Sequence, residues 1–124
     1  MKKRILMVDD EAALTRMVKL NLERTGNYEV RTENEGAKAI AAAREFKPDL
    51  IMLDVMMPGM SGDEIAAQLK EDPELSKIKF IFVTAIVTRD ETGQAGSEIG
   101  GNVFLAKPIK ADELIDTIEQ VLKT

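Results

Sequence analysis

The sequence contains no cysteine and no histidine. The absence of cysteine excludes disulfide bonds and metal sites built from thiolates. The absence of histidine removes the commonest general base and the side chain that most often changes its charge near neutral pH. Any chemistry of this chain must therefore use carboxylates, hydroxyls, lysine ammonium groups or a bound metal ion.

Long apolar runs are also absent, because no segment approaches the roughly 20 apolar residues that a membrane-spanning helix needs. The basic start, MKKR, is followed by an apolar segment of only Ile5 to Val8 and then by acids. This segment is too short for a secretory signal. We therefore expect a cytoplasmic protein that has no membrane partner.

An excess of basic residues is missing as well. Lysine and arginine number 17 against 22 acidic residues, which gives a net charge of -5. Contacts with phosphates dominate the affinity of proteins for nucleic acid, so we expect no direct nucleic acid binding. The length of 124 residues and the hydrophobic fraction of 44% predict one globular domain over residues 1–124.

Five short segments have the composition of strands: 4–8, 28–32, 49–53, 79–84 and 102–106. Four of them are continuous apolar runs, which are typical of parallel strands covered on both faces. The segment at 28–32 alternates apolar and polar residues, which indicates a strand that is less fully covered.

Helical periodicity separates the strand segments, at 11–24, at 35–46, after Gly62 and from about Asp112 onward. Five strands that alternate with helices predict an α/β fold. Since crossovers between parallel strands are right-handed, the expected architecture is a doubly wound parallel sheet built from five βα units.

Some details of the helices follow from the same pattern. The helix at 11–24 should bury an apolar face made of Leu14, Met17, Val18 and Leu22. We expect Ser61 or Asp63 to cap the third helix and Asp112 to cap the last one.

The fourth helix is expected at 89–101, but this segment contains four glycines. Each glycine inside a helix costs about 0.5–1 kcal/mol relative to alanine. We therefore predict that this helix is short, mobile or partly unwound.

Polar residues stand at the carboxyl ends of four predicted strands. These residues are Asp9 and Asp10, then Asp54, then Thr84, and finally Lys107. Ligands of open parallel sheets bind beyond these strand ends, near the point where the strand order reverses. Each residue alone could be an ordinary cap or turn residue, but their joint placement favours a single site.

Three neighbouring carboxylates repel one another, and a hard cation such as Mg²⁺ relieves this repulsion. We expect Asp10 and Asp54 to bind the ion directly and Asp9 to act through a metal-bound water. A carboxylate can also attack phosphorus to give an aspartyl phosphate. The cation, Lys107 and Thr84 would then interact with the phosphoryl oxygens of Asp54.

Four motifs carry a resemblance to a known family: ILMVDDE, KPDLIMLDVMMPGMSGDE, FIFVTA and FLAKPI. With these motifs the chain resembles the receiver domain of bacterial two-component response regulators over residues 3–123. The resemblance implies a flavodoxin-like fold with strand order 2-1-3-4-5. It implies a switch that takes a phosphoryl group from a sensor histidine kinase or a histidine phosphotransfer protein. It also implies that the chain catalyses only its own phosphorylation and dephosphorylation.

The resemblance also implies a role for each site residue. Asp54 is the expected phosphoacceptor, and Asp9, Asp10 and the backbone carbonyl of Met56 complete the expected magnesium site. Lys107 is expected to contact a phosphoryl oxygen, and the Lys107–Pro108 bond is expected to be cis.

Two residues are expected to transmit the phosphorylation signal. The Thr84 hydroxyl should move toward the phosphoryl group, and Phe104 stands at the place of the family's aromatic switch residue. Phe104 could equally be an ordinary buried phenylalanine. The output is expected to be binding of a downstream target protein through the fourth helix and the fifth strand and helix.

Met56 and Ile86 are apolar where better-known members of the family have polar residues. These positions flank the path of the water that hydrolyses the aspartyl phosphate. We hypothesise that two bulky apolar groups hinder this water and give a long-lived phosphorylated state.

Two other functions remain open at this point. A metal-dependent phosphohydrolase with an aspartyl nucleophile would need an acid two residues after Asp54, where Met56 stands. A receiver-like interaction module that is never phosphorylated is the second alternative. We expect a monomer or a weak, phosphorylation-dependent dimer. Since the chain ends soon after the last predicted helix, we expect either a stand-alone regulator or a fragment of a longer one, with no output domain attached.

Overall fold

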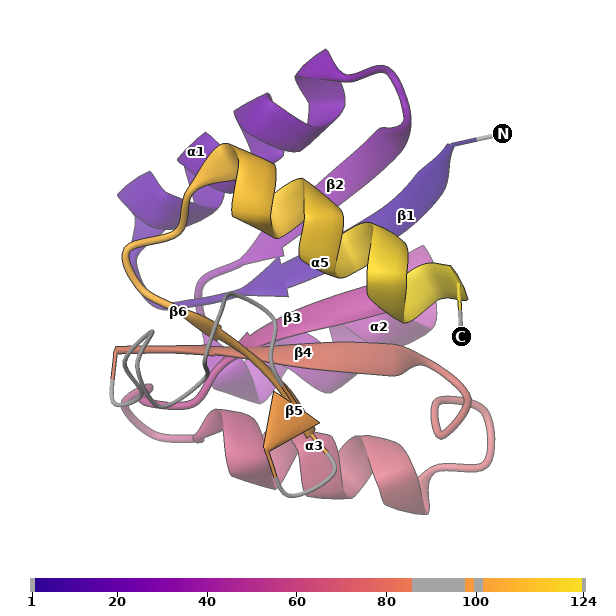
Figure 1. The fold of residues 1–124 in the computed structure, drawn as a ribbon. Helices are drawn as coiled ribbons and strands as arrows, with labels where there is room; N and C mark the ends of the chain where they lie inside the picture. Colours follow the sequence, from indigo (N-terminus) through magenta and orange to yellow (C-terminus); the bar gives the residue numbers. More distant parts are fainter. Residues whose placement is uncertain (1, 86–97, 100–101, 124) are drawn as a thin grey trace.

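The computed structural model describes residues 2–85, 98–99 and 102–123 (Figure 1). The elements in chain order are β1 (Lys3–Val8), α1 (Ala12–Arg24), β2 (Tyr28–Glu33), η1 (Gly36–Lys38), α2 (Ala39–Phe46), β3 (Leu50–Asp54), α3 (Gly62–Glu71), β4 (Lys79–Thr84), β5 (Glu98–Ile99), β6 (Asn102–Ala106) and α5 (Ala111–Lys123).

The strands form one sheet in the order β2-β1-β3-β4-β6-β5. The first five of these strands are parallel, and β5 pairs with β6 in the antiparallel direction. With β6 as the fifth parallel strand, this is the predicted order 2-1-3-4-5, and the flavodoxin-like fold is confirmed. The strand order reverses between β1 and β3, where a ligand site is expected.

The prediction of a fourth helix at 89–101 is wrong at two of its residues. Glu98 and Ile99 form the short strand β5 instead of the end of a helix. Residues 86–97 and 100–101, which make up the rest of this prediction, lie outside the described residues.

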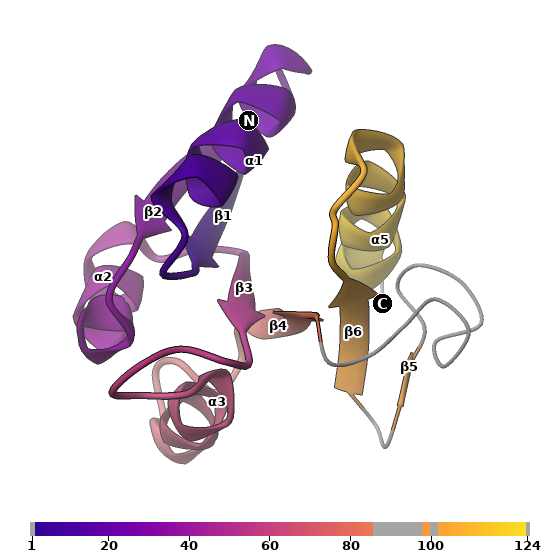
Figure 2. The ribbon, with the colours of Figure 1, turned by 90° about the vertical axis from the view of Figure 1, so that its left-hand side faces the viewer.

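Helices cover both faces of the sheet, with α1 and α5 on one side and α2 and α3 on the other (Figure 2). Successive residues of β1 alternate between the two layers: Ile5 and Met7 pack against α1 and α5, while Leu6 and Val8 pack against α2 and α3. All four side chains are buried. Because both faces are covered here, the strand is apolar at each position from Ile5 to Val8 rather than at every second one.

Two predicted details of the helices are wrong. Met17 is 39% exposed, so only Leu14, Val18 and Leu22 of the predicted apolar face pack into the core. The last helix begins at Ala111, so Asp112 lies inside its first turn and does not cap it. The cap of α3 is Ser61, whose hydroxyl accepts a hydrogen bond from the Glu64 N–H at 3.3 Å.

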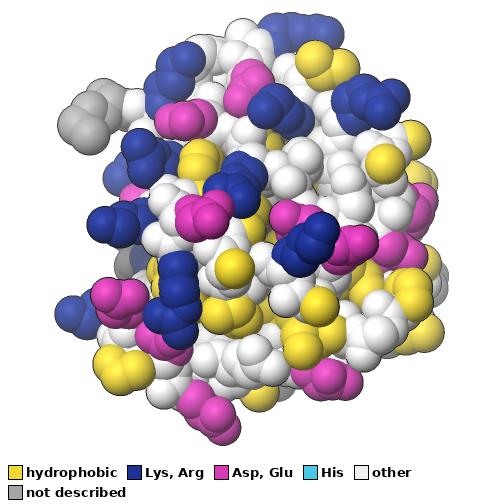
Figure 3. Space-filling view, turned by 180° about the vertical axis from the view of Figure 1, so that it is seen from behind, with side chains coloured by type: hydrophobic (Ala, Val, Ile, Leu, Met, Phe, Trp, Pro, Cys, Tyr) yellow, Lys and Arg dark blue, Asp and Glu magenta, His cyan; other side chains and the backbone are white. Residues whose placement is uncertain are grey.

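The surface shows no large region of a single charge on the face drawn in Figure 3, where basic and acidic side chains alternate around smaller apolar areas. Among the described helices, none combines the length and apolarity that crossing a bilayer requires.

Candidate functional site

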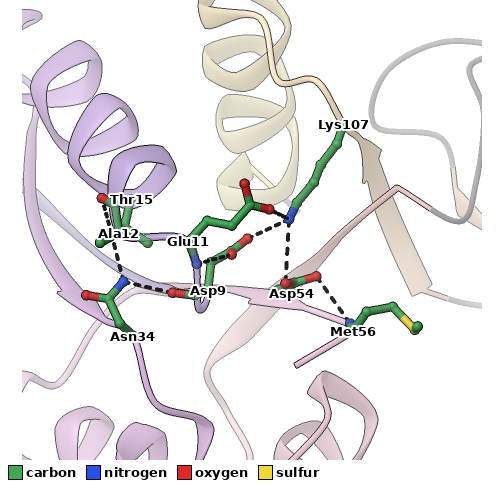
Figure 4. Close-up of polar contacts among 8 residues, drawn as sticks. All are labelled: Asp9, Glu11, Ala12, Thr15, Asn34, Asp54, Met56 and Lys107. Atoms are coloured by element: carbon green, nitrogen blue, oxygen red, sulfur yellow. Dashed lines mark hydrogen bonds and ion pairs between the residues drawn. The ribbon is translucent and has the colours of Figure 1, made fainter. Parts of the chain in front are cut away.

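Three of the predicted site residues, Asp9, Asp54 and Lys107, meet at the carboxyl edge of the sheet (Figure 4). Asp9 and Asp10 follow β1, Asp54 is the last residue of β3, Thr84 is the last residue of β4, and Lys107 follows β6. Asp9, Asp10 and Asp54 each contribute a carboxylate oxygen to a group whose members all lie within 4.8 Å of one another. The structure therefore brings together acids that are separated by more than forty positions in the sequence.

Two of these three acids are buried. The exposed fraction is 0% for Asp9 and 2% for Asp54, whereas Asp10 is exposed to solvent. Burial raises the pKa of Asp54 to about 6, and the nearby charges of Asp9 and Asp10 add to the rise, while the N–H of Met56 and the Lys107 ammonium oppose it. Burial also raises the pKa of Asp9. Burial therefore disfavours the charged form of both carboxylates.

The Lys107 ammonium is the cation that the acids share. Its Nζ atom lies 2.8 Å from Glu11 Oε1, 3.0 Å from Asp9 Oδ2 and 3.5 Å from Asp54 Oδ2. Burial alone would lower the pKa of Lys107, but the hydrogen bond to Glu11, the ion pair with Asp9 and the charges of the acids outweigh it and raise this pKa. Lys107 is therefore charged, and it lies closer to Asp9 and Glu11 than to Asp54.

The chain around Asp54 is fixed by its own backbone. The N–H of Val55 donates to the carbonyl of Val83 at 3.2 Å, and the N–H of Met56 donates to Asp54 Oδ1 at 3.2 Å. Gly62, the first residue of α3, packs directly on this turn, because an added Cβ there would lie 2.4 Å from the Asp54 carbonyl oxygen. The turn after β3 therefore needs glycine at position 62.

The carboxylates suit a hard divalent cation. Magnesium prefers oxygen ligands and commonly binds through one or two carboxylates together with phosphate oxygens. Asp9 Oδ2 is buried, and among the described residues it has an ion pair with Lys107 but no hydrogen bond of ordinary geometry. An oxygen in this state has capacity for a metal or a metal-bound water. The residues present thus fit the predicted Mg²⁺, and the carbonyl of Met56 remains a predicted ligand.

Thr84 and Phe104 lie on the neighbouring strands. Thr84 is fully buried, and its carbonyl accepts a hydrogen bond from the Lys107 N–H at 3.0 Å. Phe104 is half-buried and packs on Phe82, with ring centroids 5.2 Å apart. Phe104 therefore belongs to the edge of the core, and its role as a switch remains a prediction.

Met56 and Ile86 are the two apolar positions predicted to slow hydrolysis, and the structure describes only the first. The Met56 side chain is 63% exposed and extends away from the Asp54 carboxylate (Figure 4). Ile86 lies outside the described residues. The Lys107–Pro108 bond is cis, as the resemblance implies.

Three residues of this site were not singled out from the sequence. Glu11 pairs with Lys107, and its place directly after the two aspartates was the available signal. Asn34 donates hydrogen bonds to the Asp9 carbonyl oxygen at 2.8 Å and to the Thr15 hydroxyl at 3.0 Å. No pattern in the sequence points to Asn34 or Thr15.

Comparisons with known proteins agree with this geometry. A family model described as the response regulator receiver domain matches residues 5–119. The chain is 41% identical over 123 residues to the protein PilH of Pseudomonas aeruginosa, covering 96% of this chain and 97% of PilH. It is 43% identical over 109 residues to the response regulator PleD of Caulobacter vibrioides, covering 88% of this chain but only 24% of PleD.

A solved structure has the same fold. The chemotaxis protein CheY4 of Vibrio cholerae matches with a TM-score of 0.82 and 28% identity, over 98% of this chain and 99% of that one. The similarity thus extends over nearly the whole length of PilH and CheY4, whereas the chain spans about a quarter of PleD.

Proposed function

The chain belongs to the family of response regulator receiver domains, and we propose that it accepts a phosphoryl group on the Asp54 carboxylate in a magnesium-dependent reaction. One observation supports this most strongly. The buried Asp54 carboxylate lies in one group with those of Asp9 and Asp10, within 4.8 Å, and 3.5 Å from the Lys107 ammonium. Such an arrangement combines a nucleophile, a cation-binding set of oxygens and a fixed positive charge.

In the proposed reaction, an oxygen of Asp54 forms a bond to phosphorus while the bond from phosphorus to the donor's leaving atom breaks. The leaving atom keeps the electron pair, and any proton that it takes up comes from solvent. Because the pKa of Asp54 is about 6, the carboxylate is mostly ionised at neutral pH and able to attack. Asp9, Asp10 and Asp54 would hold the Mg²⁺, which supplies positive charge to the phosphoryl oxygens. Lys107 holds a second positive charge at the same place.

The proposed output is a change of shape next to Asp54. Phosphorylation adds close to two negative charges and strong acceptor oxygens. The Thr84 hydroxyl would move toward these oxygens, and Phe104 would fill the space that it leaves. Shifting a population from 1:99 to 99:1 needs about 5.5 kcal/mol of differential stabilisation, which several charge-assisted hydrogen bonds can supply.

The proposed partners follow from this reaction. The phosphoryl donor is a sensor histidine kinase or a histidine phosphotransfer protein, and the acceptor of the signal is a downstream target protein. The target would bind the surface formed by β6 and α5 together with the segment at 89–101, where the sequence predicts the fourth helix. We propose that the chain acts in the cytoplasm, as a monomer or as a dimer that forms weakly on phosphorylation.

The proposal is tested by incubating the protein with Mg²⁺ and acetyl phosphate and measuring its intact mass. A single phosphoryl adduct is expected, which is lost in Asp54→Asn and kept in Asp116→Asn, a control at an exposed position of α5. Without Mg²⁺ the adduct should form far more slowly. Continuous turnover of diverse phosphate esters would instead support a phosphohydrolase, and absence of any adduct would support an unphosphorylated interaction module.

A further inference from the structure

The backbone of Asp9 is held by the residues that follow β2. The register between β1 and β2 ends at the pair Val8 and Glu33. Beyond it, the N–H of Asp9 donates to the Glu33 carbonyl at 3.1 Å, and the Asp9 carbonyl accepts from the Asn34 side-chain amide at 2.8 Å. The chain turns away from β1 at this point, so the amide of Asn34 replaces the backbone N–H that a longer strand would provide.

The amide of Asn34 is itself held in place. Its nitrogen also donates to the Thr15 hydroxyl at 3.0 Å, and this hydroxyl donates to the Ala12 carbonyl at 3.1 Å. Thr15 is only 2% exposed. Because the partner at Asp9 is a carbonyl oxygen, the atom that faces it must be the nitrogen of the amide. The side chain therefore joins the end of β2, the start of α1 and the acidic turn between β1 and α1.

This turn carries two of the three clustered acids. Asp9 Oδ1 accepts a hydrogen bond from the Glu11 N–H at 2.9 Å, so the turn has one internal bond. The carboxylates of Asp9, Asp10 and Asp54 repel one another when no cation is bound. Asn34 lies on the β2 side of this turn, opposite Asp54, so its hydrogen bond does not draw the turn toward β3 (Figure 4). The bond instead fixes the Asp9 backbone in one place, and it opposes any displacement that would break the contact with the Asp9 carbonyl.

We infer that Asn34 is a positioning residue that fixes the Asp9–Asp10 turn in the one place, relative to Asp54, that magnesium binding requires. The inference rests on the proposed function, because it assigns a role toward the same metal. Asn34 does not touch the ion or the phosphoryl group, and it acts through the backbone of Asp9. Loss of residues that orient metal ligands commonly weakens metal affinity by about 10- to 100-fold. For this single bond we expect about tenfold.

The variant Asn34→Asp separates positioning from simple electrostatics. Aspartate has the size and shape of asparagine, but its ionised oxygens cannot donate to the Asp9 carbonyl. It also adds a negative charge beside the acid cluster, which by Coulomb attraction alone would strengthen the binding of a dication. If Asn34 positions the turn, Asn34→Asp should bind Mg²⁺ more weakly. If only the added charge matters, the variant should bind Mg²⁺ more tightly. The matched control is Asn27→Asp, the same change at an exposed residue beside the amino-terminal end of β1.

Two measurements test the inference. The first is a calorimetric titration with Mg²⁺ alone, where Asn34→Asp should raise the dissociation constant about tenfold and Asn27→Asp should leave it unchanged. The second is amide hydrogen exchange without Mg²⁺, where the Glu11 N–H should exchange at least several times faster in Asn34→Asp while the amides of Ile5 and Leu6 are unchanged. Asn34→Ala, which adds no charge, should change both values in the same direction.

The outcomes are distinct. Unchanged or tighter Mg²⁺ binding in Asn34→Asp, or unchanged exchange at Glu11 in both Asn34 variants, overturns the role assigned to Asn34. If the unaltered protein binds no Mg²⁺ or forms no aspartyl phosphate, the proposed function fails. The exchange measurement then still decides whether Asn34 holds the turn.

Discussion

Gly62 at the start of α3 packs on the backbone of Asp54 so closely that a side-chain carbon at position 62 would lie 2.4 Å from the Asp54 carbonyl oxygen. The contact involves backbone atoms on one side, so a rotamer change cannot relieve it. The position of the Asp54 carboxylate therefore depends on a residue that carries no functional group.

Gly62→Ala should displace the turn after β3 and weaken the site. Alanine favours helices by about 1 kcal/mol over glycine, but overpacking of this kind costs about 1–3 kcal/mol. We expect net destabilisation in thermal unfolding and a slower reaction with acetyl phosphate. Gly26→Ala is the control, because Gly26 has a φ of +79° and no atom within 4 Å of an added Cβ. It should lower stability without affecting Asp54, and an equal loss of phosphorylation in both variants would contradict the account.

Asp54→Asn should stabilise the protein at neutral pH when Mg²⁺ is absent. The pKa of Asp54 is raised on folding from 3.8 to about 6, so the folded state is favoured while this carboxyl is protonated. That stability is fully present below pH 3.8 and is lost as the pH rises through about 6. The asparagine variant avoids the loss, and its advantage should be on the order of 1–3 kcal/mol above this range and vanish in acid.

Urea unfolding of Asp54→Asn and of Asp116→Asn at several pH values checks this prediction. Asp116→Asn, at an exposed position, should follow the unaltered protein at every pH. Addition of Mg²⁺ should reverse the order of stability at neutral pH, because the variant loses a carboxylate ligand. An advantage of Asp54→Asn that grows in acid would have the wrong sign.

Lys107→Met should destabilise the protein at neutral pH, because Asp9 and Asp54 would remain buried without their shared cation. Loss of hydrogen bonds between charged groups costs about 2 kcal/mol. The deficit should shrink in acid, where the two carboxyls, whose pKa values are raised, take up protons. Thermal unfolding in Mg²⁺-free buffer measures it, with Lys110→Met at a neighbouring exposed position as the control. A deficit that is independent of pH would argue that Lys107 acts only through packing.

Thr84→Ala should separate phosphorylation from its output. The adduct on Asp54 should still form, because the nucleophile and the acids remain. The buried hydroxyl that is proposed to follow the phosphoryl group would be missing. Amide chemical shifts of β6 and α5 on addition of beryllofluoride should then change much less than in the unaltered protein. Thr84→Ser, which keeps the hydroxyl, should respond almost normally, and identical responses of the two variants would remove Thr84 from the mechanism.

The sheet was predictable from the sequence to a large extent. Because the parallel strands are covered on both faces, their continuous apolar runs end within one residue of the observed strand bounds, as at 49–53 against Leu50–Asp54. The meeting of Asp9, Asp10 and Asp54 also follows, since parallel strands end at one edge. The strand β5 could not be predicted in this way, because two residues are too few to show a periodic pattern.

The arrangement of side chains within the site was less predictable. The expected contact of Lys107 with a phosphoryl oxygen stays a prediction, and in this structure its nearest partners are Glu11 and Asp9, with Asp54 Oδ2 at 3.5 Å. This preference depends on the path of a long side chain, which spacing in the sequence does not determine. The bond from Asn34 to Asp9 depends on where the chain leaves β2. The slow hydrolysis predicted from Met56 and Ile86 stays a prediction. The Met56 side chain faces away from Asp54 in this structure (Figure 4), and Ile86 lies outside the described residues.

A crystal structure of the protein with Mg²⁺ and beryllofluoride tests the central claim most directly. The account predicts beryllofluoride on an oxygen of Asp54, the ion bound beside it by the aspartates at the end of β1, and the Lys107 ammonium moved onto a fluoride. Beryllofluoride absent from Asp54, or an ion bound away from Asp9 and Asp10 with Lys107 still paired to Glu11, would contradict it.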